Sequence, residues 1–165
     1  MVYLSYAGNG GAIWLFLIVA LFATGKPNLR KAALLALLAL SVSYLANEGL
    51  KLLFHRPRPY EALAVVDLLV KPLEVSRSSF PSGHAVAAFA VAIVMSWKIP
   101  RLMVFLIALA VLMAFSRIYV GMHYLSDVLA GGALGALFGY LAIKNESMIL
   151  RNIESFYQRI LKEML

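Results

Sequence analysis

The sequence predicts an all-α fold, a polytopic transmembrane helical bundle of about five spans with short interfacial helices. Hydrophobic residues make up 62% of the 165 residues and charged residues only 14%, whereas an average soluble domain is about 45 to 50% apolar. Cysteine is absent, which excludes disulfides and cysteine-based metal or redox sites. We expect one membrane-embedded domain over residues 1–144, followed by a C-terminal amphipathic helix over residues 145–165.

Five apolar segments are the predicted spans, at residues 10–24, 32–54, 83–97, 102–115 and 124–143. A helix needs about 20 residues to cross a bilayer. The second and fifth segments reach that length, whereas the other three need flanking residues. We expect the first to extend back through residues 2–10, where Tyr3 and Tyr6 would suit the aromatic belt at the membrane interface.

Two further segments have amphipathic patterns. The connection between the second and third spans alternates between apolar residues and charges, which predicts a short helix lying in the interface; its members are Leu63, Val66, Asp67, Leu69, Lys71, Leu73 and Glu74. The C-terminal segment has an apolar stripe at helical spacing, formed by Ile149, Ile153, Phe156, Ile160 and Met164. The stripe favours a helix on the cytoplasmic membrane surface, with a dimer contact or a frayed tail as alternatives.

The net charge is +7, and the positions of the basic residues predict the orientation of the chain in the membrane. Lysines and arginines gather in the connections that five spans would place on one side, namely Lys26, Arg30, Lys31, Lys98, Arg101, Lys144 and Arg151. The positive-inside rule makes that side cytoplasmic. The chain is then a multi-pass protein of the inner (cytoplasmic) membrane, with its opposite end facing the periplasm or cell exterior. We expect no nucleic acid partner.

Polar and ionisable residues mark the ends of the spans that share the outer side. Their insertion into a membrane centre costs about 2.5 to 3.5 kcal/mol per charged residue, so they indicate function. The group comprises Lys51, His55, Arg56, Arg58, Ser82, His84, Ser116, Arg117, His123 and Asp127. The predicted topology brings them together at the outer end of the bundle.

Part of this group has the character of a phosphate site. Lys51 and His55 are four residues apart and would share one face of a helix, while the sequence RPRP ends that helix and turns Arg58 back over it. The sequence PSGH places Ser82 where the next helix begins, and N–H groups at a helix N-terminus bind anions. Cations, a hydroxyl and N–H groups together predict a phosphate cradle.

The two remaining histidines have the character of an acid and a nucleophile. Asp127 follows His123 by four residues and could fix the tautomer of its ring and stabilise its positive form. That combination makes an activated histidine nucleophile or base. His84 comes from another helix and is free to act as the acid. Phosphoester cleavage without a metal needs this division of roles, because one group attacks phosphorus and another protonates the departing oxygen.

Three stretches, KLLFHRPRP (51–59), PSGH (81–84) and SRIYVGMHYLSD (116–127), resemble the signature motifs of the type 2 phosphatidic acid phosphatase superfamily, the membrane lipid phosphate phosphatases. The resemblance covers residues 51 to about 143. It implies a phosphohistidine mechanism, with His123 as nucleophile, Asp127 as its partner and His84 as general acid. It also implies that no metal or cofactor is needed and that the phosphate is bound by Lys51, Arg58, Ser82, Gly83 and Arg117. Many integral members have six spans, and we expect the five spans of this chain to correspond to all but the first of them.

The resemblance implies an enzyme that removes a terminal phosphate from a membrane lipid on the outer face. Implied substrates are undecaprenyl pyrophosphate, phosphatidylglycerophosphate, phosphatidate and the 1-phosphate of lipid A, and the sequence does not choose among them. One alternative is a vanadium haloperoxidase of the same superfamily, but those enzymes are soluble. Another is a non-catalytic lipid binder or channel subunit, which would need cations but neither an acid nor a nucleophile. The oligomeric state stays open.

Several other residues have more modest interpretations. Gly131, Gly135 and Gly139 continue the four-residue spacing of His123 and Asp127, which predicts a close-packing face that anchors this helix. We expect Glu48 to pair with Lys51 or with an arginine. The sequence leaves open whether substrate contacts reach His55, Arg56 or Arg77.

Overall fold

The computed structural model describes residues 1–63, 69 and 78–164, and the secondary structure of this part of the chain is entirely helical. The elements are α1 (Val2–Ala7), η1 (Asn9–Gly11), α2 (Ala12–Ala23), α3 (Pro27–Leu53), α4 (Pro59–Ala62), α5 (Gly83–Lys98), η2 (Pro100–Leu102), α6 (Met103–Tyr119), α7 (Leu125–Lys144) and α8 (Glu146–Met164). The predicted all-α class is confirmed. The predicted interfacial helix lies almost wholly outside the described residues.

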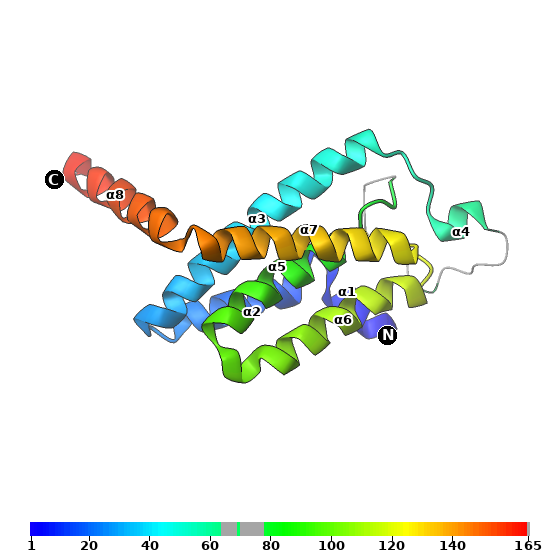
Figure 1. Cartoon of the computed structure of the whole chain (residues 1–165), viewed down its shortest axis with the longest axis horizontal. Helices are drawn as coiled ribbons and strands as arrows, with labels where there is room; N and C mark the ends of the chain where they lie inside the picture. Colours follow the sequence, from blue (N-terminus) through cyan, green and yellow to red (C-terminus); the bar gives the residue numbers. More distant parts are fainter. Residues whose placement is uncertain (64–68, 70–77, 165) are drawn as a thin grey trace.

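The helices α2, α3, α5, α6 and α7 run roughly along the long axis of the molecule, and α8 extends from one end (Figure 1). Three described helices are long and apolar enough to cross a membrane: α3, the continuous η2–α6 segment Pro100–Tyr119, and α7. The other two apolar helices, α2 and α5, have 12 and 16 residues. The five apolar segments predicted from the sequence are therefore helices, and two of them are short.

The expected backward extension of the first span is wrong. Gly10 and Gly11 have φ angles of 58° and 74°, which lie in the left-handed region that glycine adopts readily. These two residues separate α1 from α2, so the chain turns and α1 packs against α6 at the end of the bundle. As a result, Ser5 of α1 is buried.

The helix α5 forms the centre of the bundle, where α3, α6 and α7 pack against it. Its tightest neighbour is α7, because three glycines face its backbone. A Cβ atom added to Gly131, Gly135 or Gly139 would lie 2.5, 2.3 or 2.8 Å from the carbonyl oxygens of Ser82, Val86 and Ala90 respectively. The predicted close-packing face is confirmed, and it fixes the register of α7 on α5.

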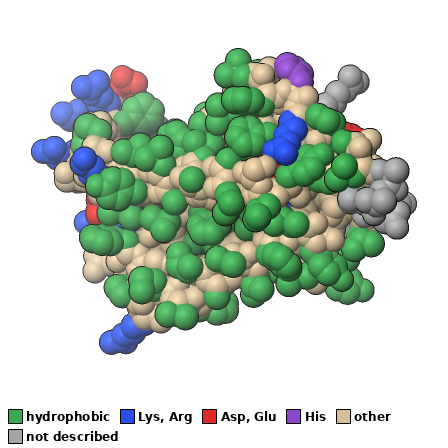
Figure 2. All heavy atoms as spheres, turned by 45° about the vertical axis from the view of Figure 1, so that its right-hand side comes forward, with side chains coloured by type: hydrophobic (Ala, Val, Ile, Leu, Met, Phe, Trp, Pro, Cys, Tyr) green, Lys and Arg blue, Asp and Glu red, His purple; other side chains and the backbone are tan. Residues whose placement is uncertain are grey.

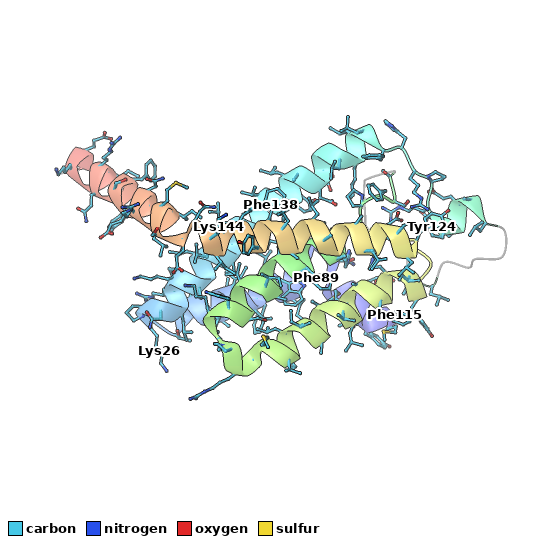
Figure 3. The ribbon with its side chains drawn as sticks, viewed as in Figure 1. Lys26, Phe89, Phe115, Tyr124, Phe138 and Lys144 are labelled. Atoms are coloured by element: carbon cyan, nitrogen blue, oxygen red, sulfur yellow. The ribbon has the colours of Figure 1, made fainter. Side chains whose placement is uncertain are left out.

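The basic connections gather at one end of the molecule. The helix α3 begins just after Lys26, and α5 and α7 end at Lys98 and Lys144. Figure 3 shows Lys26 and Lys144 at the same end and Tyr124 at the other. Lys98 pairs with Glu146, which ties the end of α5 to the start of α8. Between the two ends, hydrophobic side chains cover most of the face shown in Figure 2.

A substitution at Gly135 tests the close approach of α5 and α7. Gly135→Ala should lower the stability by about 1 to 3 kcal/mol, because the added methyl group meets backbone atoms that cannot rotate away. Its added Cβ would lie 2.3 Å from the Val86 oxygen and 2.9 Å from the Ala90 nitrogen.

The matched control is Gly49→Ala in α3, where nothing lies within 4 Å of an added Cβ. That control should be neutral or stabilising by up to about 1 kcal/mol. Thermal unfolding in detergent measures both, and equal melting temperatures would contradict the packing argument.

Candidate active site

The predicted site residues lie at the end of the bundle opposite the basic connections. They are contributed by the C-terminal ends of α3 and α6, the N-terminal ends of α5 and α7, and the adjoining loops. All but the partly exposed Gly83 are largely buried: Lys51, Arg58, Ser82, His84, Arg117, His123 and Asp127. Buried ionisable groups are costly unless partners or ligands stabilise them. Their concentration at one end of a membrane bundle therefore indicates a functional site.

The α3 side of the site is formed by Lys51. Its Nζ atom lies 2.9 Å from Glu48 Oε1, so the expected ion pair between these residues is confirmed. A Cβ atom added to Gly83 would lie 3.8 Å from that Nζ, which places the ammonium group beside the first turn of α5. His55, in contrast, is exposed. The expectation that it shares a helical face with Lys51 is wrong, because α3 ends at Leu53.

Arg58 turns back into the site after α3, as the sequence predicts. It is only 2% exposed, and its Nη1 atom lies 3.5 Å from the carbonyl oxygen of Met122. Its backbone N–H donates to Glu61 Oε2 at the start of α4. This short helix therefore fixes the main chain from which the guanidinium group extends. Arg77 lies outside the described residues.

The α5 side of the site is a helix N-terminus. Ser82 is the N-cap residue, and Gly83 begins the helix. The Ser82 N–H donates to the carbonyl oxygen of Asp127 at 3.0 Å, which ties the PSGH turn to α7. The Ser82 hydroxyl is buried and has no partner within the described part of the chain. The N–H groups of a first helical turn lack partners within their helix, so this turn offers donors to an anion.

His123 is held by a backbone carbonyl. Its Nδ1 atom lies 2.7 Å from the oxygen of Ser79 and 3.7 Å from Asp127 Oδ2. The expected proximity of Asp127 to the imidazole is therefore confirmed, while the shorter Nδ1 contact is with the Ser79 carbonyl, which the sequence did not predict. His123 also precedes α7, and Asp127 Oδ2 accepts the N–H of the N-cap residue Tyr124 at 2.9 Å. Because a carbonyl only accepts hydrogen bonds, Nδ1 carries a proton, which leaves the Nε2 lone pair of a neutral ring available for attack.

Arg56 connects the two groups that face His123 Nδ1. Its Nη1 atom lies 2.7 Å from Asp127 Oδ1, and its guanidinium carbon lies 4.0 Å from the centre of the Tyr124 ring. Its own carbonyl accepts the Ser79 N–H at 2.9 Å. The sequence left the role of Arg56 open, because nothing in RPRP tells which arginine faces substrate and which faces a carboxylate.

Ser5 is a site residue that sequence reasoning missed. Its carbonyl oxygen lies 3.3 Å from His84 Nε2, and its hydroxyl accepts a hydrogen bond from Arg117 Nη1. A Cβ atom added to nearby Gly8 would lie 2.7 Å from His84 Cδ2. The segment around α1 therefore covers both the candidate acid and a candidate phosphate ligand. Only the GNGG sequence could have indicated this, as a flexible turn before the first apolar helix.

Comparison with known proteins agrees with this geometry. The model of the PAP2 superfamily matches residues 32–150. Undecaprenyl-diphosphatase BcrC of Bacillus subtilis is 30% identical over 138 residues, which cover 84% of this chain and 66% of that protein. Phosphatidylglycerophosphatase B of the same organism is 34% identical over 145 residues, which cover 80% and 68% of the two chains. This chain thus spans about two thirds of the length of both relatives.

A solved structure extends the similarity to three dimensions. The crystal structure of Aquifex aeolicus LpxE superposes with a TM-score of 0.72 at 32% identity, over 86% of this chain and 82% of that one. The family model, the sequence relatives and this fold agree, and the three motifs converge on one buried site. The chain belongs to the PAP2 superfamily.

Proposed function

We propose that the chain is a membrane lipid phosphatase that removes a terminal phosphate from a lipid through a covalent phosphohistidine, without a metal. The observation that carries this proposal is the environment of His123. Its Nδ1–H donates to the Ser79 carbonyl, its backbone N–H donates to the Arg117 carbonyl at 3.2 Å, and Arg58 Nη1 lies 3.5 Å from the carbonyl oxygen of the preceding residue, Met122. A histidine held through Nδ1, with its main chain tied to two buried arginines, suits attack on a phosphate better than it suits metal binding or simple lipid adhesion.

The reaction has two steps. His123 Nε2 attacks phosphorus, the bond from phosphorus to the departing lipid oxygen breaks, and His84 gives that oxygen a proton. Water then attacks the phosphohistidine, His84 takes its proton, and inorganic phosphate leaves while His123 is regenerated. Asp127 stabilises the positive charge that develops on His123 during the first step.

The phosphate oxygens are held by groups from three helices and a loop. Lys51, Arg58 and Arg117 supply charge, and the first turn of α5 supplies the Gly83 N–H and the Ser82 hydroxyl. The Ser82 N–H serves a different purpose, because it already donates to Asp127. Such donors stabilise the charge of the transferring phosphoryl group because they are oriented before the reaction begins.

The substrate is a lipid with a terminal phosphate or pyrophosphate. The named relatives act on undecaprenyl diphosphate and phosphatidylglycerophosphate, and phosphatidate and the 1-phosphate of lipid A remain further candidates. The site faces the periplasm or cell exterior, since the basic end with Lys26, Lys98 and Lys144 is cytoplasmic by the positive-inside rule. The amphipathic helix α8 then lies on the cytoplasmic side.

Two histidine variants test the chemistry. His123→Ala should reduce phosphate release from a lipid phosphate at least about 10,000-fold, because no other nucleophile replaces it. His84→Ala should slow cleavage of an alkyl phosphate strongly but affect p-nitrophenyl phosphate little, since nitrophenolate leaves without a proton. Colorimetric assays of released phosphate and nitrophenol in detergent measure both. Near-normal rates of both variants on an alkyl phosphate would contradict the mechanism.

Arg56 should act by positioning Asp127 and the Ser79 carbonyl. Arg56→Gln removes the charge-assisted hydrogen bonds to Asp127 Oδ1 and Ser126 Oγ. It should lower kcat about 10- to 100-fold while KM stays within about twofold. Arg30→Gln is a matched control, because Arg30 also stacks on an aromatic ring, that of Phe22, but lies at the opposite end. A rise in KM at constant kcat would instead indicate that Arg56 binds substrate.

The orientation in the membrane can be tested independently of the chemistry. The chain has no cysteine of its own, so single cysteines at Lys26 and Glu61 report the two ends. An impermeant thiol reagent should label the Glu61 position in intact cells and the Lys26 position only after the membrane is opened. Labelling of the Lys26 position in intact cells would invert the orientation.

A further inference from the structure

The short helix α1 turns one side towards the site. Val2, Ser5 and Gly8 follow one another at intervals of three residues and so share one face. Ser5 and Gly8 are buried, whereas Tyr3 and Tyr6 on the other side are 90% and 40% exposed. Serine is mostly exposed in proteins, and a buried hydroxyl costs free energy unless it is hydrogen-bonded. The Ser5 hydroxyl, on a residue that is only 1% exposed, therefore needs a partner.

The partner of the Ser5 hydroxyl is Arg117. The hydroxyl accepts a hydrogen bond from Arg117 Nη1, and Arg117 is 2% exposed in the last turn of α6. A guanidinium group carries five N–H donors in one rigid plane. A partner on one of them fixes the orientation of the plane, and with it the directions of the other N–H groups. The contact therefore orients a cation that the proposed mechanism uses to bind phosphate.

The Ser5 carbonyl contacts the other proposed reactive group, His84. Its oxygen lies 3.3 Å from His84 Nε2, and because a carbonyl only accepts hydrogen bonds, Nε2 carries a proton. His123 is held in a similar way, since its Nδ1 lies 2.7 Å from the Ser79 carbonyl. Each of the two buried histidines thus has one ring nitrogen on a backbone carbonyl. This arrangement leaves the other ring nitrogen of each histidine for the reaction.

Packing at both ends of α1 holds this turn against the site. At its start, Val2 packs on Val120 and Met122 in the loop between α6 and α7. At its end, Gly8 lets the chain pass close to the imidazole, because an added Cβ would lie 2.7 Å from His84 Cδ2. The serine between these two contacts is therefore placed by packing on either side of it.

We propose that Ser5 is a positioning residue for the reaction: its carbonyl orients His84 as the proton donor, and its hydroxyl orients Arg117 towards the phosphate. This inference rests on the proposed lipid phosphatase function. In the first step the departing oxygen takes the Nδ1 proton of the charged His84 ring, while the Nε2 proton stays in the hydrogen bond to Ser5. In the second step the attacking water returns a proton to Nδ1. The ring therefore keeps one orientation throughout the cycle.

Ser5→Ala tests the hydroxyl, because it removes that group and keeps the carbonyl. Binding of inorganic phosphate, measured by isothermal titration calorimetry in detergent, should weaken about tenfold as Arg117 loses its orientation. The value of kcat/KM should fall by a similar factor on hexadecyl phosphate and on p-nitrophenyl phosphate. A purely structural role would lower the melting temperature and leave phosphate affinity within about twofold of the parent, which would overturn the proposal.

The matched control is Ser43→Ala. Ser43 is also buried, and its hydroxyl donates to the Leu40 carbonyl within α3 at 3.0 Å. This variant should keep phosphate affinity and both rates within about twofold of the parent. An equal loss in the control would mean that any buried serine has this effect, which would reject a specific role for Ser5.

Gly8→Ala tests the carbonyl, because the added methyl group would push α1 away from the His84 ring. Loss of the oriented acid should slow hexadecyl phosphate more than p-nitrophenyl phosphate, since nitrophenolate leaves without a proton. The ratio of the two rates should therefore fall at least about tenfold in Gly8→Ala and stay within about twofold of the parent in Ser5→Ala. An unchanged ratio in a folded Gly8→Ala variant would overturn the role of the carbonyl.

The same measurements separate this inference from the proposed function. Faster cleavage of both substrates by Ser5→Ala or Gly8→Ala would show that α1 obstructs the site, which would overturn the positioning role while the phosphatase function stood. If the parent cleaved no phosphate ester, the proposed function would fail. Weaker binding of inorganic phosphate by Ser5→Ala, with Ser43→Ala unchanged, would then still support the orientation of Arg117 by Ser5.

Discussion

The close approach of α7 to α5 is the constraint on which the site depends. Gly131 lets the backbone of α7 come against the Ser82 carbonyl, and the Ser82 N–H in turn donates to the Asp127 carbonyl. The start of α5, which carries His84, is thereby fixed relative to the loop that carries His123. A side chain at position 131 would push the N-terminus of α5 away from α7 and from the loop that carries His123.

The short length of α5 places this chemistry at a particular depth. Sixteen residues correspond to about 24 Å of helix, less than the hydrocarbon core of about 30 Å. The helix therefore begins below the membrane surface if its other end, at Lys98, lies at the opposite interface. The first turn of α5 then lies near the depth at which a lipid carries its phosphate.

Much of this arrangement was predictable because a chain that crosses a membrane several times can adopt few folds. Apolar length defined the helices, the antiparallel order of the spans determined which ends meet, and the four-residue glycine spacing identified the α5–α7 contact. The errors concern local backbone geometry. The sequence gives no sign that α3 ends before His55 or that Gly10 and Gly11 fold α1 over the site. Nor does it show that Asp127 Oδ2 also accepts the Tyr124 N–H, or that the Ser79 carbonyl makes the shorter contact with His123 Nδ1.

The role of Ser79 has a consequence for genetics. The atom that orients His123 is a carbonyl oxygen, which every residue type possesses. Its position therefore depends on the path of the main chain and not on which side chain stands at position 79. Exchange of the Ser79 side chain for alanine leaves that oxygen in place. A mutational scan therefore scores position 79 by how well each side chain fits a fully buried space, and the part that its carbonyl plays in orienting His123, the proposed nucleophile, goes unrecorded. Substitutions at position 79 can therefore keep the hydrogen bond to His123, and the sequence alone would not show that this residue orients the ring.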